Sequence, residues 1–413
     1  MPANPARRRL AVAGLTALAL GSAVTGAVLG AGQSDEADNA PLSEPGRAKP
    51  RESVSFLARI VPPAAPAANE RDPAVPRSIM ERARQLPLER QVAQLFVFGF
   101  EGTDAGADIF PRLRRLDVGG ILIGPGSYAD PAQLDALAGE ATAVARRGDH
   151  LPPFVLASQQ GGDLNSLPDL PPSQAPADTP SASAAAAGAL DSARALRDLN
   201  VTGVLGPVLD VGLESGSPLG ARVYSDDPEE LVAFAEATVD SYRRARVFSS
   251  AAHFPGLGAA DQSTEEGPAT VGLDLAELRE RDLIPFEAAI DAGVPGVTLA
   301  HALYPVGDFT VPASLSRRIA TGLLRDELGF EGVALTDDLA DPAITTLYTV
   351  PDAAVEAVRA GADMLLVSGP AGDQQAAYVA VLRAARSARI PRARLERAVG
   401  RILVAKRNYG LTR

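Results

Sequence analysis

The chain has 413 residues and a formal net charge of −12 at pH 7, from 39 Lys and Arg against 51 Asp and Glu. This negative balance disfavours binding to a phosphate backbone, so we predict no nucleic-acid partner. The absence of Cys excludes disulfides and thiolate metal sites, and three His argue against a histidine-rich zinc site. We therefore expect no metal or cofactor, and chemistry that depends on carboxylates, hydroxyls and imidazoles.

The first 32 residues have the pattern of an export signal. Arg7–Arg9 form a basic cluster, and Leu10–Gly32 carries no charge, as in the positively charged and apolar regions of a signal sequence. The uncharged stretch is also long enough to span a bilayer. A cleaved signal and a retained membrane anchor both stay open, and either predicts an exported protein, extracellular or anchored at the cell envelope.

Residues 33–76 are rich in Pro, Ala and acidic residues. Such a composition buries too little apolar surface to offset the entropy lost on ordering, so we predict a disordered linker. A Pro-rich linker is semi-extended and would hold the folded part away from a membrane if the anchor is kept. The folded domain is then expected over residues 77–413.

That domain alternates between short apolar runs and longer amphipathic segments. Eight runs are predicted as strands: 94–100, 119–124, 154–158, 203–211, 247–254, 296–304, 332–339 and 362–369. Segments with helical apolar spacing lie between them, for example 130–147, 181–199, 227–245, 274–293 and 314–330. The runs are continuous, which is typical of parallel strands covered by helices. We predict an α/β fold, a single (β/α)8 TIM-type barrel, with an open doubly wound sheet as the alternative.

The active site of such a barrel is built at the C-terminal ends of the strands. The fourth run ends in Asp210 and is followed by Arg222, the fifth ends in His253, the sixth carries His301, and the seventh ends in the Asp337–Asp338 pair. Each residue alone has a structural explanation; the aspartate pair, for example, could cap a helix. Together these groups would form a recognition surface for hydroxyl-rich or anionic ligands, and sugars are natural candidates.

Four segments carry a family resemblance: Val204–Gly212, Ala252–Gly258 (AHFPGLG), Val311–Leu339 with its TDDL motif, and Ala398–Leu411. They resemble glycoside hydrolase family 3, in particular its single-barrel β-N-acetylglucosaminidase branch. The likeness runs from about Leu86 to Leu411, across the whole predicted barrel.

The resemblance implies a retaining mechanism, in which one carboxylate attacks the anomeric carbon while a second group protonates the departing oxygen and then activates water. Asp337 matches the family nucleophile, and a carboxylate is ionised at neutral pH without help. His253, Arg222 and His301 fall on family positions that contact the sugar in the terminal subsite. Asp210 lies in a matching strand-end motif and is also predicted to bind substrate.

The sequence departs from the family pattern at two sugar-contacting positions. The family lysine before the strand-five histidine is Ala252, and the family acidic residue after strand three is Ser158. A charged hydrogen bond to a sugar contributes about 1.5 to 3 kcal/mol, so losing two would weaken terminal-sugar binding by roughly a hundredfold or more.

The loop after strand five departs furthest. The β-N-acetylglucosaminidase branch carries an Asp-x-His dyad there as its general acid and base, and this sequence has Ser263 and Glu265 at those positions. Glu265, or its neighbour Glu266, is the predicted replacement, because a carboxylic acid with a raised pKa serves most glycosidases. The alternative is that both glutamates are simply solvated.

Two functions therefore stay open. The first is an exported hydrolase of O-glycosidic bonds, of the β-N-acetylhexosaminide type, acting on a glycan of the cell envelope. The second is a catalytically impaired family member that binds an envelope glycan or protein. General acid catalysis contributes roughly 10²- to 10⁴-fold, so its loss would leave a slow enzyme rather than an inert one.

Overall fold

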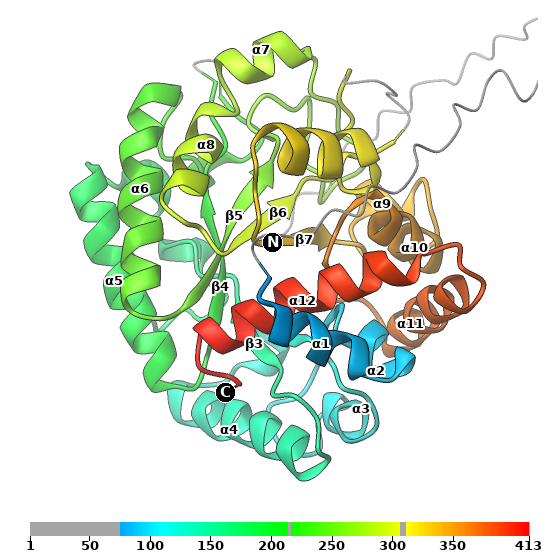
Figure 1. Cartoon of the computed structure of the whole chain (residues 1–413). Helices are drawn as coiled ribbons and strands as arrows, with labels where there is room; N and C mark the ends of the chain where they lie inside the picture. The colour runs from blue at the N-terminus through cyan, green and yellow to red at the C-terminus, as the bar shows by residue number, and fades with distance from the viewer. Residues whose placement is uncertain (1–74, 214–215, 306–310, 413) are drawn as a thin grey trace, which may run out of the picture. The chain divides into compact units, whose positions relative to one another are not determined.

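Figure 1 shows the chain as a computed structural model, which describes residues 75–213, 216–305 and 311–412. The predicted export signal at 1–32 and nearly all of the predicted linker at 33–76 lie outside these residues. Within the described part of the chain, no helix is long and apolar enough to cross a membrane.

Eight parallel strands form a closed barrel, which confirms the predicted (β/α)8 fold over the open sheet. The strands are β1 Phe96–Gly99, β2 Gly120–Ile123, β3 Phe154–Ala157, β4 Gly203–Val208, β5 Phe248–Phe254, β6 Gly296–Leu299, β7 Val333–Asp338 and β8 Met364–Val367. Each lies within its predicted run. Neighbours in sequence pair with each other, and β1 closes the ring against β8 with Val97 opposite Leu366.

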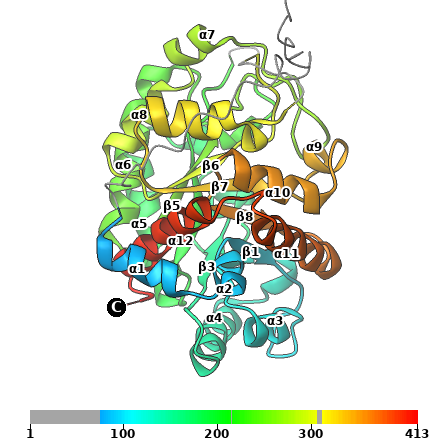
Figure 2. The ribbon, with the colours of Figure 1, turned by 45° about the vertical axis from the view of Figure 1, so that its right-hand side comes forward.

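Helices surround the barrel and connect its strands (Figure 1, Figure 2). The α-helices are α1 Arg77–Gln85, α2 Leu88–Ala93, α3 Ile109–Arg115, α4 Pro131–Arg147, α5 Ala182–Asp198, α6 Pro228–Arg244, α7 Leu275–Glu280, α8 Ile284–Asp291, α9 Pro342–Thr345, α10 Val350–Ala360, α11 Ala371–Arg386 and α12 Arg392–Asn408. The 3₁₀ turns are η2 Pro125–Ser127, η3 Gly162–Leu164, η4 Pro176–Asp178, η5 Gly220–Arg222 and η6 Ala313–Leu315, and η7 Arg318–Glu327 is a π-helix.

Three of the long outer helices are capped by the first residue of the predicted segments 130–147, 181–199 and 227–245. The side chains of Asp130, Ser181 and Asp227 accept backbone N–H groups in the first turns of α4, α5 and α6. Each cap of this kind contributes about 1 kcal/mol to stability. The caps therefore determine where each loop that follows a strand ends and the next outer helix begins.

The single helix predicted over 274–293 is wrong, because the chain forms two helices there, α7 and α8. Between them Asp282 is fully buried and pairs with Arg281 at 3.0 Å. Pro285 then lies in the first turn of α8. Proline lacks the N–H that a continuous helix would need at this position, whereas the first turn of a new helix leaves that group unused.

The main apolar cluster of the core fills the barrel and the layer between strands and helices, and a smaller cluster contains Ala185, Val211, Leu231 and Phe234. Rings such as Phe154 and Phe248, 5.0 Å apart between centroids, are among the largest members of the main cluster. Helices α1 and α12 lie side by side (Figure 1, Figure 2), and α12 also contacts β7. Tyr409, just after α12, meets Phe248 at the start of β5, so α12 lies across the N-terminal end of the barrel.

Candidate active site

Three predicted residues meet at the C-terminal ends of β4, β5 and β7. His253 Nδ1 lies 2.8 Å from Asp210 Oδ2, and His253 Nε2 lies 3.8 Å from Asp337 Oδ2. The imidazole therefore lies between two carboxylates, that of Asp210 just after β4 and that of Asp337 at the end of β7. This is the convergence of strand-end residues that the barrel predicts.

Asp210 holds this part of the site together from a fully buried position. Besides the imidazole, its carboxylate accepts the backbone N–H groups of His253, at 3.2 Å, and Leu257, at 2.6 Å. These bonds tie the segment after β5 to the end of β4. The contacts suit a residue that acts through His253, and direct contact of Asp210 with a sugar stays a prediction.

The charge of His253 is set by two opposing effects. Burial alone would lower the pKa of the imidazole, but the charge and hydrogen bond of Asp210, followed by the charge of Asp337, raise this pKa to about 9. The ring is then an imidazolium at neutral pH. Its Nδ1–H donates to Asp210, and the Nε2–H faces Asp337 and any ligand beside that carboxylate.

Asp337 and Asp338 are adjacent but have different surroundings. Asp338 Oδ1 accepts the N–H groups of Ala340 and Ser368, each at 3.0 Å, so its carboxylate holds the turn after β7 against β8. The Asp337 side chain is 22% exposed, and its Oδ1 accepts the N–H of Asp338 at 3.1 Å. Asp337 thus keeps an open side toward the mouth of the barrel, as a nucleophile requires.

Arg222 and Glu265 are joined, although their loops follow different strands. Arg222, at the end of η5, donates from Nη1 to Glu265 Oε1 at 2.7 Å. The Arg222 side chain is 31% exposed and that of Glu265 is 58% exposed. The predicted acid/base therefore lies at the rim of the site as the ion-pair partner of a predicted sugar-binding residue.

His301 follows β6 and is almost fully buried. Its Nδ1 lies 2.8 Å from Ser314 Oγ, and burial lowers the pKa of the ring even though the charge of Asp337 opposes this. A neutral imidazole results. Within the described residues its buried Nε2 makes no hydrogen bond of normal geometry, and the backbone of Asp337 and Asp338 interacts with the ring.

One further carboxyl group, Asp341, was not predicted from the sequence. It is the N-cap residue of α9, and its N–H donates to Asp338 O at 2.9 Å. Burial, and then the charges of Asp337, Asp338 and Glu265, raise the pKa of Asp341 to about 9, against the opposing charge of His253. A signal was present: Asp341 is a third aspartate three residues after the predicted pair.

The end of β3 has no charge where the family pattern has one. Ser158 Oγ lies 3.4 Å from Gln160 Nε2. The neighbouring Gln159 is buried, and its amide donates to backbone carbonyls of the following loop, among them Leu167 O at 3.0 Å. This side of the mouth is therefore lined by neutral groups, as the sequence indicated.

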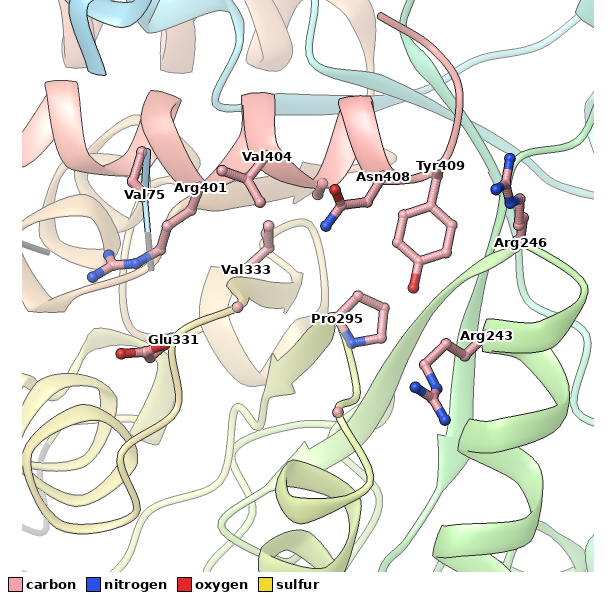
Figure 3. A pocket seen from close by; sticks show the side chains of 13 residues that line it. Val75, Arg243, Arg246, Pro295, Glu331, Val333, Arg401, Val404, Asn408 and Tyr409 are labelled. Atoms are coloured by element: carbon pink, nitrogen blue, oxygen red, sulfur yellow. The ribbon is translucent and has the colours of Figure 1, made fainter. Parts of the chain in front are cut away.

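A cavity of about 320 Å³ lies at the opposite end of the barrel (Figure 3). It is lined by Arg243 and Arg246 near the end of α6, by Pro295 and Val333 at the starts of β6 and β7, and by the face of α12 that leads to Tyr409. None of the six predicted site residues lines it. Among residues 75–213, 216–305 and 311–412, no cluster of His, Asp and Glu has the arrangement of a metal site.

A closed parallel barrel with histidines, an arginine and carboxylates at the C-terminal strand ends has the organisation of a TIM-barrel enzyme. The chain belongs to glycosyl hydrolase family 3, because the model of the family's N-terminal domain matches residues 87–405. This finding confirms the resemblance of the sequence motifs.

Relatives agree with this assignment. A secreted glycosyl hydrolase of Arthroderma benhamiae, named as uncharacterized, is 31% identical over 304 residues, which are 71% of this chain and 86% of the relative. A β-hexosaminidase of Nitrosomonas eutropha is 30% identical over 262 residues, 60% of this chain and 73% of the relative. Both relatives are named as enzymes that act on glycosides.

Solved structures show the same barrel. A family 3 β-N-acetylglucosaminidase from Paenibacillus sp. has a TM-score of 0.76 and 35% identity, over 79% of this chain and 63% of that one. A family 3 glycosyl hydrolase from Mycobacterium smegmatis has a TM-score of 0.71 and 30% identity, over 78% of this chain and 98% of the other. This chain thus matches less than two thirds of the length of the Paenibacillus protein.

Proposed function

We propose that this protein is an exported glycosidase that hydrolyses β-N-acetylhexosaminide-type bonds in a glycan of the cell envelope, by a retaining mechanism with Asp337 as nucleophile. One observation carries the proposal: the partly exposed carboxylate of Asp337 closes β7 and lies 3.8 Å from the imidazolium of His253. Relatives named as β-hexosaminidases and β-N-acetylglucosaminidases support the substrate class. The secreted relative and the apolar stretch Leu10–Gly32 support export.

Each group has a defined task in this reaction. Asp337 attacks the anomeric carbon and forms a covalent glycosyl-enzyme, which water then hydrolyses by attack from the opposite face of the sugar, the face that the aglycone has left. His253, oriented by Asp210, donates from Nε2 to a sugar hydroxyl close to the attacked carbon. Arg222 donates to hydroxyls from the rim, and His301 presents Nε2 from β6.

The group that protonates the departing oxygen is less simple to assign. Glu265 is the residue that the sequence predicts for this task, and its loop lies against the segment after β7, since Thr264 O accepts the N–H of Ala343 at 3.1 Å. Its carboxylate is paired with Arg222 at 2.7 Å. This pair occupies Oε1, so Glu265 would have to release Arg222 for that oxygen to contact the departing group.

A second candidate function is glycan binding without turnover. The observation that favours it is the loss of charge at Ser158 and Ala252, two sugar-facing positions of the family, while the barrel itself is intact. Under this alternative the site would still bind an oligosaccharide through Arg222 and His253.

Hydrolysis of an aryl β-N-acetylglucosaminide by the wild type, by Asp337→Asn and by Asp326→Asn separates these functions. Asp326 is an exposed aspartate on η7 and serves as the matched control. We expect turnover by the wild type and the control, and a rate no higher than that of buffer for Asp337→Asn. Equal rates for the wild type and Asp337→Asn would remove the proposal, and saturable oligosaccharide binding without turnover would favour the second function.

A further inference from the structure

The proposed reaction depends on the direction of the His253 imidazole, so the inference that follows rests on the proposed function. His253 Nε2 lies 3.8 Å from Asp337 Oδ2, and His253 Nδ1 lies 2.8 Å from Asp210 Oδ2. Asp210 follows β4 and His253 lies in β5, so their relative position depends on how the segments after these two strands are packed. Both segments contact Arg281 and Asp282, which lie between α7 and α8.

Arg281 holds the segment that follows β4. Its Nη2 donates to Val211 O at 3.1 Å and also to Gly212 O, and Val211 comes directly after Asp210. The same guanidinium donates from Nη1 to Asp282 Oδ2 at 3.0 Å. A guanidinium carries five N–H donors in a fixed plane, so this one side chain can hold two backbone carbonyls and a carboxylate at the same time.

Asp282 holds the turn that follows His253. Its side chain is fully buried, and a Cβ atom at residue 256 would lie only 2.5 Å from Asp282 Cβ. Gly256 has a φ of +126°, in the region that favours glycine, so this turn packs directly against the aspartate. The hydroxyl group of Tyr304 also donates to Gly256 O at 2.7 Å. Two buried side chains from outside β5 therefore fix the turn.

Stability alone is a poor explanation for this ion pair. In the described part of the chain, the Asp282 carboxylate accepts hydrogen bonds from Arg281 alone. Burial raises the pKa of Asp282 to about 7, against the opposing charge of Arg281 and with a further rise from the charge of Asp210. Replacing a buried ion pair by apolar side chains is often neutral or stabilising. The contacts of the pair with both segments point instead to the geometry that it imposes.

We propose that Arg281, with its partner Asp282, positions His253 for the reaction. The guanidinium joins the backbone after Asp210 to the carboxylate that supports the turn after His253. The imidazole therefore keeps its hydrogen bond to Asp210 and directs Nε2 toward a sugar beside Asp337. Arg281 and Asp282 are positioning residues, because they act on the sugar only through His253.

The test follows the protonation of His253 by imidazole ¹⁵N NMR of the full chain. Three His are present, and His253→Gln identifies the signal of His253. Arg281→Met removes the guanidinium and keeps a long side chain. Burial then keeps the unpaired Asp282 protonated near neutral pH, so the net charge of the pair stays at zero. We expect the pKa of His253 to fall from about 9 by about one to two pH units, because its charged hydrogen bond to Asp210 is weakened.

Two further variants separate positioning from other effects. Arg279→Met, two residues earlier, removes an ion pair with Glu327 at the surface and should leave the titration of His253 unchanged. The double variant Arg281→Met/Asp282→Asn leaves no buried carboxyl group without its partner and should show the same fall as Arg281→Met. On an aryl β-N-acetylglucosaminide, kcat/KM of both Arg281 variants should fall by roughly 10- to 100-fold, because small misplacements of a reacting group cost about this much.

Three outcomes would overturn the inference. The first is an unchanged titration of His253 in Arg281→Met that urea unfolding shows to be folded, and the second is an equal shift in Arg279→Met. The third is unfolding of both Arg281→Met and the double variant, which would assign the pair to the fold alone. The proposed function fails separately, when Asp337→Asn hydrolyses the aryl glycoside as fast as the wild type, since the titration of His253 needs no turnover.

Discussion

The two ends of the barrel surround an aspartate with charges of opposite sign. Directly before β8, at the N-terminal end, Asp363 is fully buried and receives Arg325 at 2.7 Å, Arg394 at 3.1 Å and Arg401 at 3.3 Å. Arg401 also lines the cavity at that end (Figure 3). Beyond β7, at the C-terminal end, Asp341 is surrounded mainly by other carboxylates.

The two environments move the pKa of an aspartate in opposite directions. Burial raises the pKa of Asp363, but the charges of Arg401, Arg325 and Arg394 outweigh it and hold the pKa below its ordinary value. At Asp341 burial and like charges act together and raise the pKa to about 9. Charges at the N-terminal end thus favour the ionised form of Asp363, and those at the C-terminal end favour the protonated form of Asp341.

The largest expected effect comes from removing the compensated aspartate. Asp363→Ala leaves three largely buried guanidinium groups without their carboxylate, and breaking a buried charge network in this way costs about 3 to 5 kcal/mol. We expect that loss in the free energy of unfolding measured with urea. The exposed Asp373, changed to Ala, should stay within about 0.5 kcal/mol of the wild type. A loss below about 1 kcal/mol for Asp363→Ala would contradict the claim that this charge network stabilises the fold.

A smaller effect, a gain in sugar affinity, is expected from restoring a charge at the C-terminal end of the barrel. Ser158→Asp returns the carboxylate that family members place after β3, where it can accept sugar hydroxyl groups. A charged hydrogen bond of about 1.5 to 3 kcal/mol should tighten sugar binding by roughly tenfold or more. Calorimetric titration with N-acetylglucosamine would measure this gain, and Ser158→Asn, with similar size and no charge, should not show it. Equal affinities of Ser158→Asp and Ser158→Asn for the sugar would contradict the assignment of position 158 to the sugar-binding side of the site.

The smallest effect concerns stability at the functional end. Asp341→Asn removes a carboxyl group that is costly to ionise in the fold, so we expect the variant to be more stable than the wild type by about 1 to 2 kcal/mol at pH 8. Because the pKa of Asp341 is raised, the folded chain binds a proton that the unfolded chain releases above its ordinary pKa of about 4. The stability that Asp341 contributes therefore falls as the pH rises from about 4 to about 9.

The stabilisation by Asp341→Asn should accordingly shrink as the pH is lowered from 8 toward 4. Asp363 gives the opposite slope, since its lowered pKa provides stability that is present above its unfolded value and lost as the pH falls through its folded value. Urea midpoints of Asp341→Asn between pH 8 and 4, and of Asp363→Ala as the pH is lowered further below about 4, check the two signs. A stabilisation by Asp341→Asn that is independent of pH would count against its raised pKa.

The barrel could be predicted because the same sequence pattern, a short apolar run followed by an amphipathic segment, recurs along the domain. Every strand is a continuous apolar run, and the polar residue at the end of each run had to lie at one mouth once the sheet was known to be parallel. This argument placed Asp210, His253 and Asp337 together, and the structure joins them through the two sides of one imidazole.

What could not be predicted lies in the loops. The pairing of Arg222 with Glu265 joins residues from two loops whose conformations no periodicity determines. Asp341 could be placed just after β7, but an aspartate before proline usually caps the helix that follows. That it caps nothing and has no partner in the described residues depends on the surrounding fold, and so does its raised pKa.

Trapping of the glycosyl-enzyme tests the central claim most directly. The wild type is incubated with the 5-fluoro derivative of N-acetylglucosaminyl fluoride, whose covalent intermediate breaks down slowly, and peptic fragments are analysed by mass spectrometry. We predict one added sugar on Asp337 in the wild type and in Glu265→Gln, and none in Asp337→Asn. A sugar attached to any other residue, or an unlabelled Asp337 in protein that turns over aryl glycosides, would contradict the account.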